Sequence, residues 1–298
     1  MMRSLFLHRP VLAGLLLLST GAASAQPTTA PAPAAAATPA TAPRKIAVGD
    51  VDRIATVRDP QRSPDGQWVA YVVGTVDVAK DKSESDVWMV KWDGSERIRL
   101  TASADSESSP RWSPDGKWLS FIRPDEKKKA QVWTLSRQGG EAQKLTDVVG
   151  GVSDYAWSPD STRLVVVSRD VDPDAADGDK PDKAPKPIEI ETFKFKRDQV
   201  GYVDGKLRAH LYLYDIAKRA SSQLTSGPWD DSAPVWSPDG KRIAFLSARS
   251  ENREKSTIRE VYVVDAAAGS TPRQVSTKVA RHGEPLAFSP DGSRLLFM

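Results

Sequence analysis

Few residues in this 298-residue sequence have the types and spacing that catalysis requires. A nucleophilic serine needs a histidine as general base and an acid to orient it, and the chain has three histidines, His8, His210 and His282. The first falls in an N-terminal leader, the second begins a predicted strand and the third lies in a predicted loop. Gly151-Val152-Ser153-Asp154 lacks the second glycine of a nucleophile elbow, so we interpret it as a turn between repeats. We predict no catalytic residues in this chain.

Metal and cofactor sites are not predicted either. Cysteine is absent, which excludes disulfides and thiolate metal sites. The acidic run 170–182 could suggest calcium, but an EF-hand loop beginning at Asp170 would need glycine at Ala175 and glutamate at Pro181. We interpret this run as a solvated loop and Lys127-Lys128-Lys129 as an exposed hairpin tip. The prediction is no metal-binding residue and no cofactor.

Histidine and tryptophan side chains each leave a choice between a structural role and a binding role. His210 either lines a channel or makes hydrogen bonds at a strand edge, and its place at the start of a predicted strand favours the edge. The tryptophans either pack in the core or stack on a ligand. Because Trp112, Trp157 and Trp236 recur at one position of a repeat, we predict that each is buried between neighbouring sheets.

A four-residue phrase, Ser-Pro-Asp-Gly, recurs along the chain and predicts the elements that position these residues. Its starts are 50, 45, 79 and 52 residues apart, a spacing typical of a propeller or another repeat array. Proline presets the first corner of a tight turn, aspartate can bond its own backbone, and glycine accepts positive φ. The repeated aspartates are therefore interpreted as turn formers. They are Asp65, Asp115, Asp160 (where Ser161 replaces the glycine), Asp239 and Asp291.

The segments around each phrase predict four strands per repeat. An aromatic residue precedes four of the copies, and alternating apolar stretches follow all five, which is strand chemistry. The predicted second strands are 68–71, 118–121, 164–167, 243–246 and 295–297; the third are 87–90, 132–135, 211–214 and 261–264; the fourth are 98–101, 143–146, 222–225 and 273–276. We predict an all-β fold, a β-propeller of four-stranded blades with four complete blades and a partial fifth.

The third repeat is longer than the others, and its extra length predicts an insertion at about 169–209. Residues 170–187 are rich in Asp, Lys and Pro and predict a solvated loop. Residues 188–195 alternate well enough to be an extra strand. Residues 201–205 are predicted to turn the chain back into the third strand of the blade.

The N-terminus predicts export. Arg3, His8 and Arg9 form a basic start, 11–18 is a short apolar run, and Ala23-Ser24-Ala25 is a small-residue cleavage site. Eight apolar residues are too few to span a bilayer, which takes roughly 20. We predict a signal peptide at 1–25, with a mature chain that begins at Gln26.

The segment after the leader, 26–45, is rich in Ala, Pro and Thr and predicts a disordered linker, followed by the propeller at 46–298. Lys and Arg number 42 and Asp and Glu 39. Because two of the arginines lie in the leader, the mature chain is nearly neutral. Such a balance gives little reason to expect nucleic acid or an anionic membrane as a partner.

The tandem aromatic-Ser-Pro-Asp-Gly repeats resemble those of the Tol-system periplasmic protein and of the prolyl oligopeptidase superfamily. The third blade favours the second group. Its stretches 193–198, 201–202, 205 and 210–212 (His-Leu-Tyr) are similar to those of acylaminoacyl-peptidase-like and dipeptidyl-peptidase-like serine peptidases of the S9 type. The resemblance covers about residues 46–298.

This resemblance implies the propeller portion of a secreted, periplasmic S9 serine peptidase. In that family the propeller precedes an α/β-hydrolase domain with a nucleophile elbow, a pattern that does not occur in this sequence. The implied role is to gate the access of peptide substrates to a C-terminal hydrolase domain, which would be its partner. We expect no hydrolysis by this chain alone, and an open edge where the fifth blade stops at Met298. The alternative is a Tol-like periplasmic propeller that acts as a protein-interaction module. The peptide specificity, acylaminoacyl or dipeptidyl, stays open.

Overall fold

The computed structural model describes residues 45–137, 140–171, 190, 193, 195–198, 201–202, 206–251, 253, 258–276 and 286–297. The chain divides into two units, Met1–Ile46 and Ala47–Met298. Every described strand belongs to the second unit. The predicted leader, nearly all of the predicted linker, and His8 and His282 lie outside the described residues.

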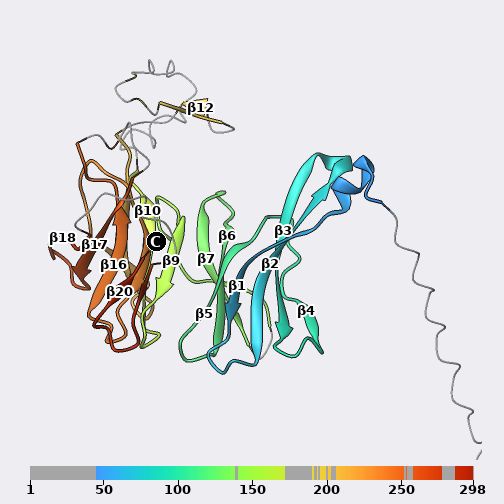
Figure 1. Cartoon of the computed structure of the whole chain (residues 1–298), viewed down its shortest axis with the longest axis horizontal. Helices are drawn as coiled ribbons and strands as arrows, with labels where there is room; N and C mark the ends of the chain where they lie inside the picture. The colour runs from blue at the N-terminus through green and yellow to red at the C-terminus, as the bar shows by residue number, and fades with distance from the viewer. Residues whose placement is uncertain are drawn as a thin grey trace, which may run out of the picture. The chain divides into compact units, whose positions relative to one another are not determined.

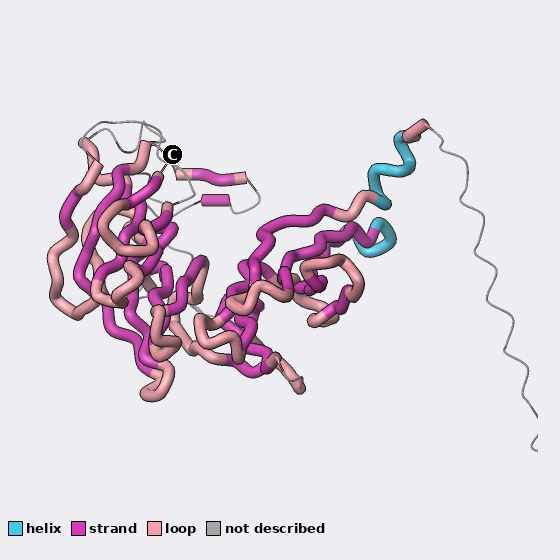
Figure 2. Tube along the Cα trace, turned by 60° about the horizontal axis from the view of Figure 1, so that its bottom comes forward, coloured by secondary structure: helices cyan, strands magenta, loops and turns pink. Residues whose placement is uncertain are grey.

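Four antiparallel four-stranded sheets follow one another along the chain (Figures 1 and 2). The first blade is β1 (Thr56–Arg62), β2 (Trp68–Asp77), β3 (Lys82–Lys91) and β4 (Arg97–Arg99), and the second is β5 (Ser108–Trp112), β6 (Trp118–Pro124), β7 (Ala130–Ser136) and β8 (Gln143–Lys144). The third is β9 (Asp154–Trp157), β10 (Arg163–Arg169), β13 (Ala209–Asp215) and β14 (Ala220–Gln223), and the fourth is β15 (Asp231–Trp236), β16 (Arg242–Ser247), β17 (Glu260–Asp265) and β18 (Arg273–Gln274). A two-stranded sheet, β19 (Ala287–Phe288) with β20 (Leu295–Leu296), comes next. The predicted β-propeller fold is confirmed.

The Ser-Pro-Asp-Gly phrase forms the turn from the first to the second strand of each blade. In the first copy the Ser63 hydroxyl donates to Asp65 Oδ1 (2.6 Å) and accepts from the Trp68 amide (2.9 Å). Gly66 takes φ +72°, which is why glycine is used there. The hydrogen bond from Ser63 is the largest cause that lowers the pKa of Asp65 to about 2. The interpretation of these aspartates as turn formers is confirmed.

An apolar cluster fills each junction between consecutive sheets. One cluster joins the first two blades, a second joins the next pair, a third joins blades three and four, and a fourth joins blade four to β19 and β20. Trp112 and Trp236 are buried, and each indole donates to a carbonyl of the preceding blade, Gln61 O and Ala156 O, both at 3.1 Å. The apolar faces that consecutive blades turn toward each other thus cover one another, as in other propellers.

Tryptophan burial is less uniform than the repeat predicts. Trp157 is only partly buried, although its indole donates to Ser120 Oγ at 2.8 Å, and Trp92 is 67% exposed beneath the guanidinium of Arg62. The prediction that all three repeat tryptophans are buried is therefore wrong for Trp157. A partly buried indole still covers apolar surface while its edge stays in water.

The insertion of the third blade also differs from the sequence prediction. Ile190, Phe193 and Phe195, the described members of the expected extra strand, lie outside strands. The strand occurs just after them, where β11 (Lys196–Arg197) pairs with β12 (Gly201–Tyr202) in a separate two-stranded sheet. Of the expected turn at 201–205, Gly201 and Tyr202 belong to strand β12, and 203–205 lie outside the described residues. Short helices complete the described elements: η1 (Val48–Arg53) and η2 (Val78–Lys80).

Candidate functional site: a cavity on the inner strands

The first strand of each blade lies at the edge of its sheet, and three of these strands carry the same irregularity. β1, β5 and β15 each contain a bulge, with a residue in the left-handed region followed by a proline. These residues are Asp59 (φ +51°), Ser109 (φ +52°) and Ala233 (φ +50°). A bulge bends its strand and re-aims a side chain. Aspartate tolerates this conformation better than most residues, whereas Ser109 and Ala233 are strained there.

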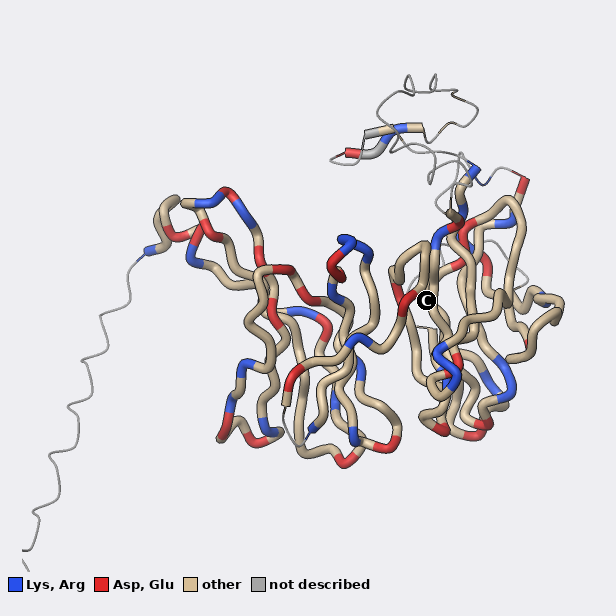
Figure 3. The backbone as a smooth tube through the Cα atoms, turned by 180° about the vertical axis from the view of Figure 1, so that it is seen from behind, with Lys and Arg blue, Asp and Glu red and all other residues tan. Residues whose placement is uncertain are grey.

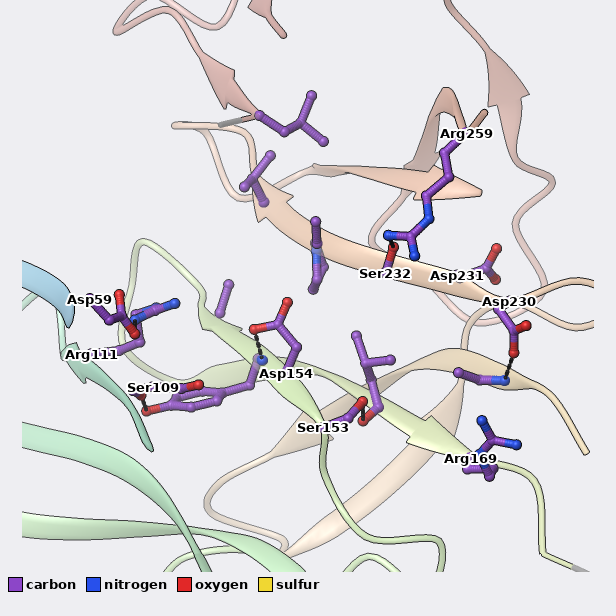
Figure 4. A pocket seen from close by; sticks show the side chains of 18 of the residues that line it. Asp59, Ser109, Arg111, Ser153, Asp154, Arg169, Asp230, Asp231, Ser232 and Arg259 are labelled. Atoms are coloured by element: carbon purple, nitrogen blue, oxygen red, sulfur yellow. Dashed lines mark hydrogen bonds and ion pairs between the residues drawn. The ribbon is translucent and has the colours of Figure 1, made fainter. Parts of the chain in front are cut away.

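These first strands surround an open cavity of about 1100 Å³. Most of its lining residues come from β1, β5, β9 and β15 or directly precede β9 and β15, and the rest come from β10, the start of β13, Arg259 and Leu286 (Figure 4). The charged and hydroxyl side chains drawn there are those of Asp59, Ser109, Arg111, Ser153, Asp154, Arg169, Asp230, Asp231, Ser232 and Arg259. The cavity therefore presents both signs of charge. Acidic and basic residues are both spread over the described part of the chain (Figure 3).

One wall is fixed by an ion pair between the first two blades. Arg111 Nη1 lies 2.7 Å from Asp59 Oδ2, and both side chains are about 30% exposed. Burial lowers the pKa of Arg111, but the hydrogen bond and charge of Asp59 outweigh that effect and raise it. The pair thus places a guanidinium that is always charged on the cavity wall, held by the residue at the bulge.

A second fixed group occupies the β9 position where the other strands have proline. Tyr155 is buried, and its hydroxyl lies 2.9 Å from Ser109 O and 2.8 Å from Ser120 Oγ. Burial raises the pKa of Tyr155, so the phenol stays protonated. Because Ser120 Oγ also donates to Arg111 O at 2.8 Å, this tyrosine ties β9 to β5 by hydrogen bonds.

The opposite wall carries the more exposed charges. Asp230 accepts from the Ala209 amide (2.9 Å) and from Arg208 Nη1 (3.4 Å), and Arg259 Nη1 donates to Ser232 Oγ (3.1 Å). The side chain of Asp230 is 51% exposed. This wall can exchange its weak surface contacts for those of a ligand.

The arrangement supplies binding groups and no assembled nucleophile. Ser153 of the Gly-Val-Ser-Asp stretch donates to Val167 O at 3.3 Å, and Gly151 makes the expected turn with φ +72°. His210 does not bond a strand edge as interpreted: its buried ring faces the carboxylates of Asp170 and Asp231. Among the described residues no group of three His, Cys, Asp or Glu side chains is placed to hold a metal ion. That the chain has no site residues stays a prediction.

The bulges and the buried tyrosine of this site could have been recognised from the sequence. A proline three residues before the serine of the repeated phrase, at Pro60, Pro110 and Pro234, marks each bulge. Tyr155 occupies the same place in β9, the strand without a bulge.

The lysine run 127–129 was predicted to be an exposed hairpin tip, and the structure confirms it. It connects β6 to β7, Lys128 has φ +57°, and the Asp125 carboxylate accepts hydrogen bonds from the Lys127 and Lys129 amides. No helix in the described part of the chain has the length and apolar character to cross a membrane.

Comparisons with known proteins agree with this architecture. A family model described as "Dipeptidyl peptidase IV (DPP IV) N-terminal region" matches residues 185–297. An uncharacterized peptidase YuxL of Bacillus subtilis is 35% identical over 221 residues, 74% of this chain and 34% of that protein. Dipeptidyl-peptidase 5 of Porphyromonas gingivalis is 28% identical over 265 residues, 82% of this chain and 37% of that protein.

Structure comparison gives the same fold. Acylaminoacyl peptidase of Pyrococcus horikoshii superposes with a TM-score of 0.61 at 20% identity, covering 83% of this chain and 36% of that one. A shorter match, 41% identical over 58 residues (20% of this chain and 11% of that protein), is to a TolB homolog of Chlorobium chlorochromatii. The chain spans about a third of the length of the peptidase relatives it matches.

Proposed function

Because the chain matches the N-terminal propeller region of S9 serine peptidases in sequence and in fold, we propose that it is the propeller portion of such a peptidase. Its role in this proposal is to admit peptides to a C-terminal α/β-hydrolase domain and to exclude larger chains. The substrates are peptides, and the hydrolase domain is the partner.

The observation that carries the proposal is the cavity on the inner strands. It has about 1100 Å³ of open space, and its walls combine rigid groups, Arg111 and Tyr155, with exposed charges of both signs at Asp230 and Arg259. A peptide carries an amide backbone and charged ends, so a mixed polar wall can hold it without requiring one sequence. The bulges of β1, β5 and β15 lie at the cavity-lining residues Asp59, Ser109 and Ala233.

The test narrows the cavity in the full-length gene product. Ser153→Trp adds a large side chain to the cavity wall, whereas Ser222→Trp adds it to the outer strand β14. We expect Ser153→Trp to lower kcat/KM for peptides of eight or more residues at least about tenfold more than for a dipeptide chromogenic substrate. The Ser222→Trp control should behave like the parent. Equal loss on long and short substrates, or no loss on either, would contradict the gating role.

A Tol-like role is the second candidate, favoured by the 58-residue match to a TolB homolog. Such a propeller would bind proteins and catalyse nothing. The full-length product decides between the two. If it hydrolyses no aminoacyl or acyl-aminoacyl peptide and its gene encodes no Gly-x-Ser-x-Gly segment, the interaction module is supported and the peptidase proposal fails.

Export is part of the proposal. The leader 1–25 is removed, the linker 26–45 follows, and the propeller 46–298 reaches the periplasm. The supporting observation is the basic, apolar and small-residue order of the leader. N-terminal sequencing of protein from the periplasmic fraction of an expressing bacterium should begin at Gln26. Soluble protein that keeps Met1 would contradict export.

A further inference from the structure

The third strand of every complete blade holds a buried polar side chain at one equivalent position. The next residue in each case donates its amide to a Ser or Thr hydroxyl beyond the fourth strand, at 2.8–3.1 Å. The site is therefore structurally equivalent from blade to blade. The four side chains are Asp86, Gln131, His210 and Glu260, exposed by 8%, 1%, 2% and 5%.

Three of these side chains are satisfied without a change of protonation. Gln131 donates to Val148 O (2.8 Å) and accepts from Thr146 Oγ1 (2.8 Å). Asp86 accepts from Arg99 Nη2 at 2.8 Å, and Glu260 accepts the Arg249 amide at 3.1 Å. A carboxylate is an acceptor and an amide is both donor and acceptor, so these groups match their surroundings as they stand.

His210 is placed differently, because each of its ring nitrogens faces a carboxylate. Nε2 lies 3.5 Å from Asp170 Oδ2, and Nδ1 lies 3.5 Å from Asp231 Oδ2. His210 Nδ1 and Asp231 Oδ2 are both buried and make no hydrogen bond in the described part of the chain. A neutral imidazole has one N–H donor and one acceptor nitrogen, whereas the imidazolium has two donors. Only the protonated ring can donate to both carboxylates.

The surrounding charges leave room for that extra proton. The second oxygen of Asp231 faces Arg249 Nη2 at 3.4 Å, and Arg249 is held over the rings of Trp229 and Tyr262. Glu260, from β17, takes the Arg249 amide. The guanidinium of Arg208, which precedes β13, pairs with Asp230, whereas the Arg208 backbone amide donates to Asp170 Oδ2 at 3.1 Å. Arg249 thus contacts Asp231 through its guanidinium and Glu260 through its backbone amide, and in the described part of the chain no lysine or arginine side chain forms an ion pair with Asp170.

The ring also joins two blades. His210 stands on β13 and Asp170 directly follows β10, both in the third blade, while Asp231 begins β15 of the fourth. Asp231 lines the cavity together with Asp230 and Ser232. The side chain of Asp170 is 32% exposed, so a proton can reach the ring from solvent on that side.

We propose that His210 is a proton-operated clamp between the third and fourth blades. With a proton on both nitrogens the ring holds Asp170 and Asp231 at once and draws the start of β15 against β13. When one proton leaves, one ring nitrogen becomes an acceptor and faces a carboxylate oxygen, which is also an acceptor. That contact is lost, and the junction between the two blades loosens at the cavity wall. The third and fourth blades are therefore bound more tightly in mildly acidic solution than in alkaline solution.

The first test measures the melting temperature of the full chain and of His210→Gln between about pH 5.5 and about pH 8, where histidine changes charge. We expect the parent to gain about 2–4 °C over the variant at the acid end, as one charge-assisted contact would in a domain of this size. Asp231→Asn should abolish the same gain, because it removes the carboxylate on the fourth blade. Glu260→Gln, at the equivalent position of blade four, should keep it.

A parallel pH dependence in the parent and His210→Gln would overturn the clamp. Retention of the gain in Asp231→Asn would overturn its connection to the fourth blade. If a variant does not fold, nitrogen-15 spectra of the parent decide, because the chain has only three imidazoles to assign. Both nitrogens of His210 should be protonated where the parent shows the gain in melting temperature, and one where that gain is lost. A ring that is neutral throughout this range contradicts the proposal.

Discussion

The junction between blades one and two and the junction between blades three and four share their geometry and differ in their polar chemistry. Glu107 and Asp231 both stand five residues before the buried tryptophan of the inner strand, and both are almost fully buried. Glu107 accepts hydrogen bonds from Thr101 Oγ1 (3.0 Å) and from the Ser103 hydroxyl. Asp231 faces an imidazole and a guanidinium at 3.5 and 3.4 Å, with one oxygen left without a hydrogen bond.

This difference shows that the repeat determines the apolar packing between neighbouring blades. It does not determine the polar contacts of the buried acid at the same junction. A buried acid supplied with hydroxyl donors is satisfied, whereas one supplied with ionisable partners depends on their protonation. Two blades can therefore dock by the same tryptophan and differ in how solution conditions affect the contact.

The largest expected effect tests the feature that the two junctions share, the buried tryptophan of the inner strand. Trp112→Ala and Trp236→Ala should each cost about 3–5 kcal/mol, because a large buried ring and an indole hydrogen bond to the preceding blade are lost. Trp157→Ala should cost less, since that ring is only partly buried. Urea unfolding of the three variants beside the parent measures this. A cost at Trp157 equal to the other two would show that exposure does not rank these sites.

The next effect tests the satisfied acid. Glu107→Leu should cost about 1–3 kcal/mol, because Thr101 and Ser103 lose a buried acceptor. Glu107→Gln keeps an acceptor oxygen and serves as the matched control, with a smaller loss. Chemical denaturation near neutral pH gives both values. If Leu and Gln behave alike, the hydroxyl contacts contribute nothing to the junction.

The same residue gives the first junction a pH dependence of its own. Burial raises the pKa of Glu107, partly offset by its hydroxyl partners. The folded protein thus binds this proton more tightly than the unfolded chain, so its stabilising contribution is complete below the unfolded pKa and is lost as pH rises through the folded one. The stability of the parent relative to Glu107→Gln should fall as pH rises above about 4.5. A flat difference from pH 4 to pH 7 would contradict the raised pKa.

The smallest expected effect concerns the Ser-Pro-Asp-Gly turns of the third and fourth blades. The fourth blade has Gly240 at φ +67°, whereas the third has Ser161 at φ +59° in the same place. Gly240→Ala should cost about 1 kcal/mol from backbone strain alone, since the added methyl would meet Pro159 at an ordinary 3.7 Å. Thermal unfolding detects a shift of this size. No change would mean that the serine in the third blade carries no penalty.

Repeats were easier to predict from the sequence than junctions. The turn phrase and the alternation around Trp68, Trp118 and Leu164 determine strand order locally, so the blades could be placed. The partners of His210 and Asp231 come from residues far apart in the chain, and no local pattern joins them. The shift of the extra strand to β11 and β12 has a related cause, because a short pairing is decided by tertiary context more than by alternation.

The prolines of the inner strands have a consequence for how the cavity meets an extended chain. An unpaired sheet edge offers a row of amides to which another strand can add. Pro60, Pro110 and Pro234 lack that amide, and the bulge beside each breaks the row further. The edges of β1, β5 and β15 that line the cavity therefore resist β-augmentation. A peptide passing through the proposed route meets side chains instead of becoming a fifth strand, and can leave again.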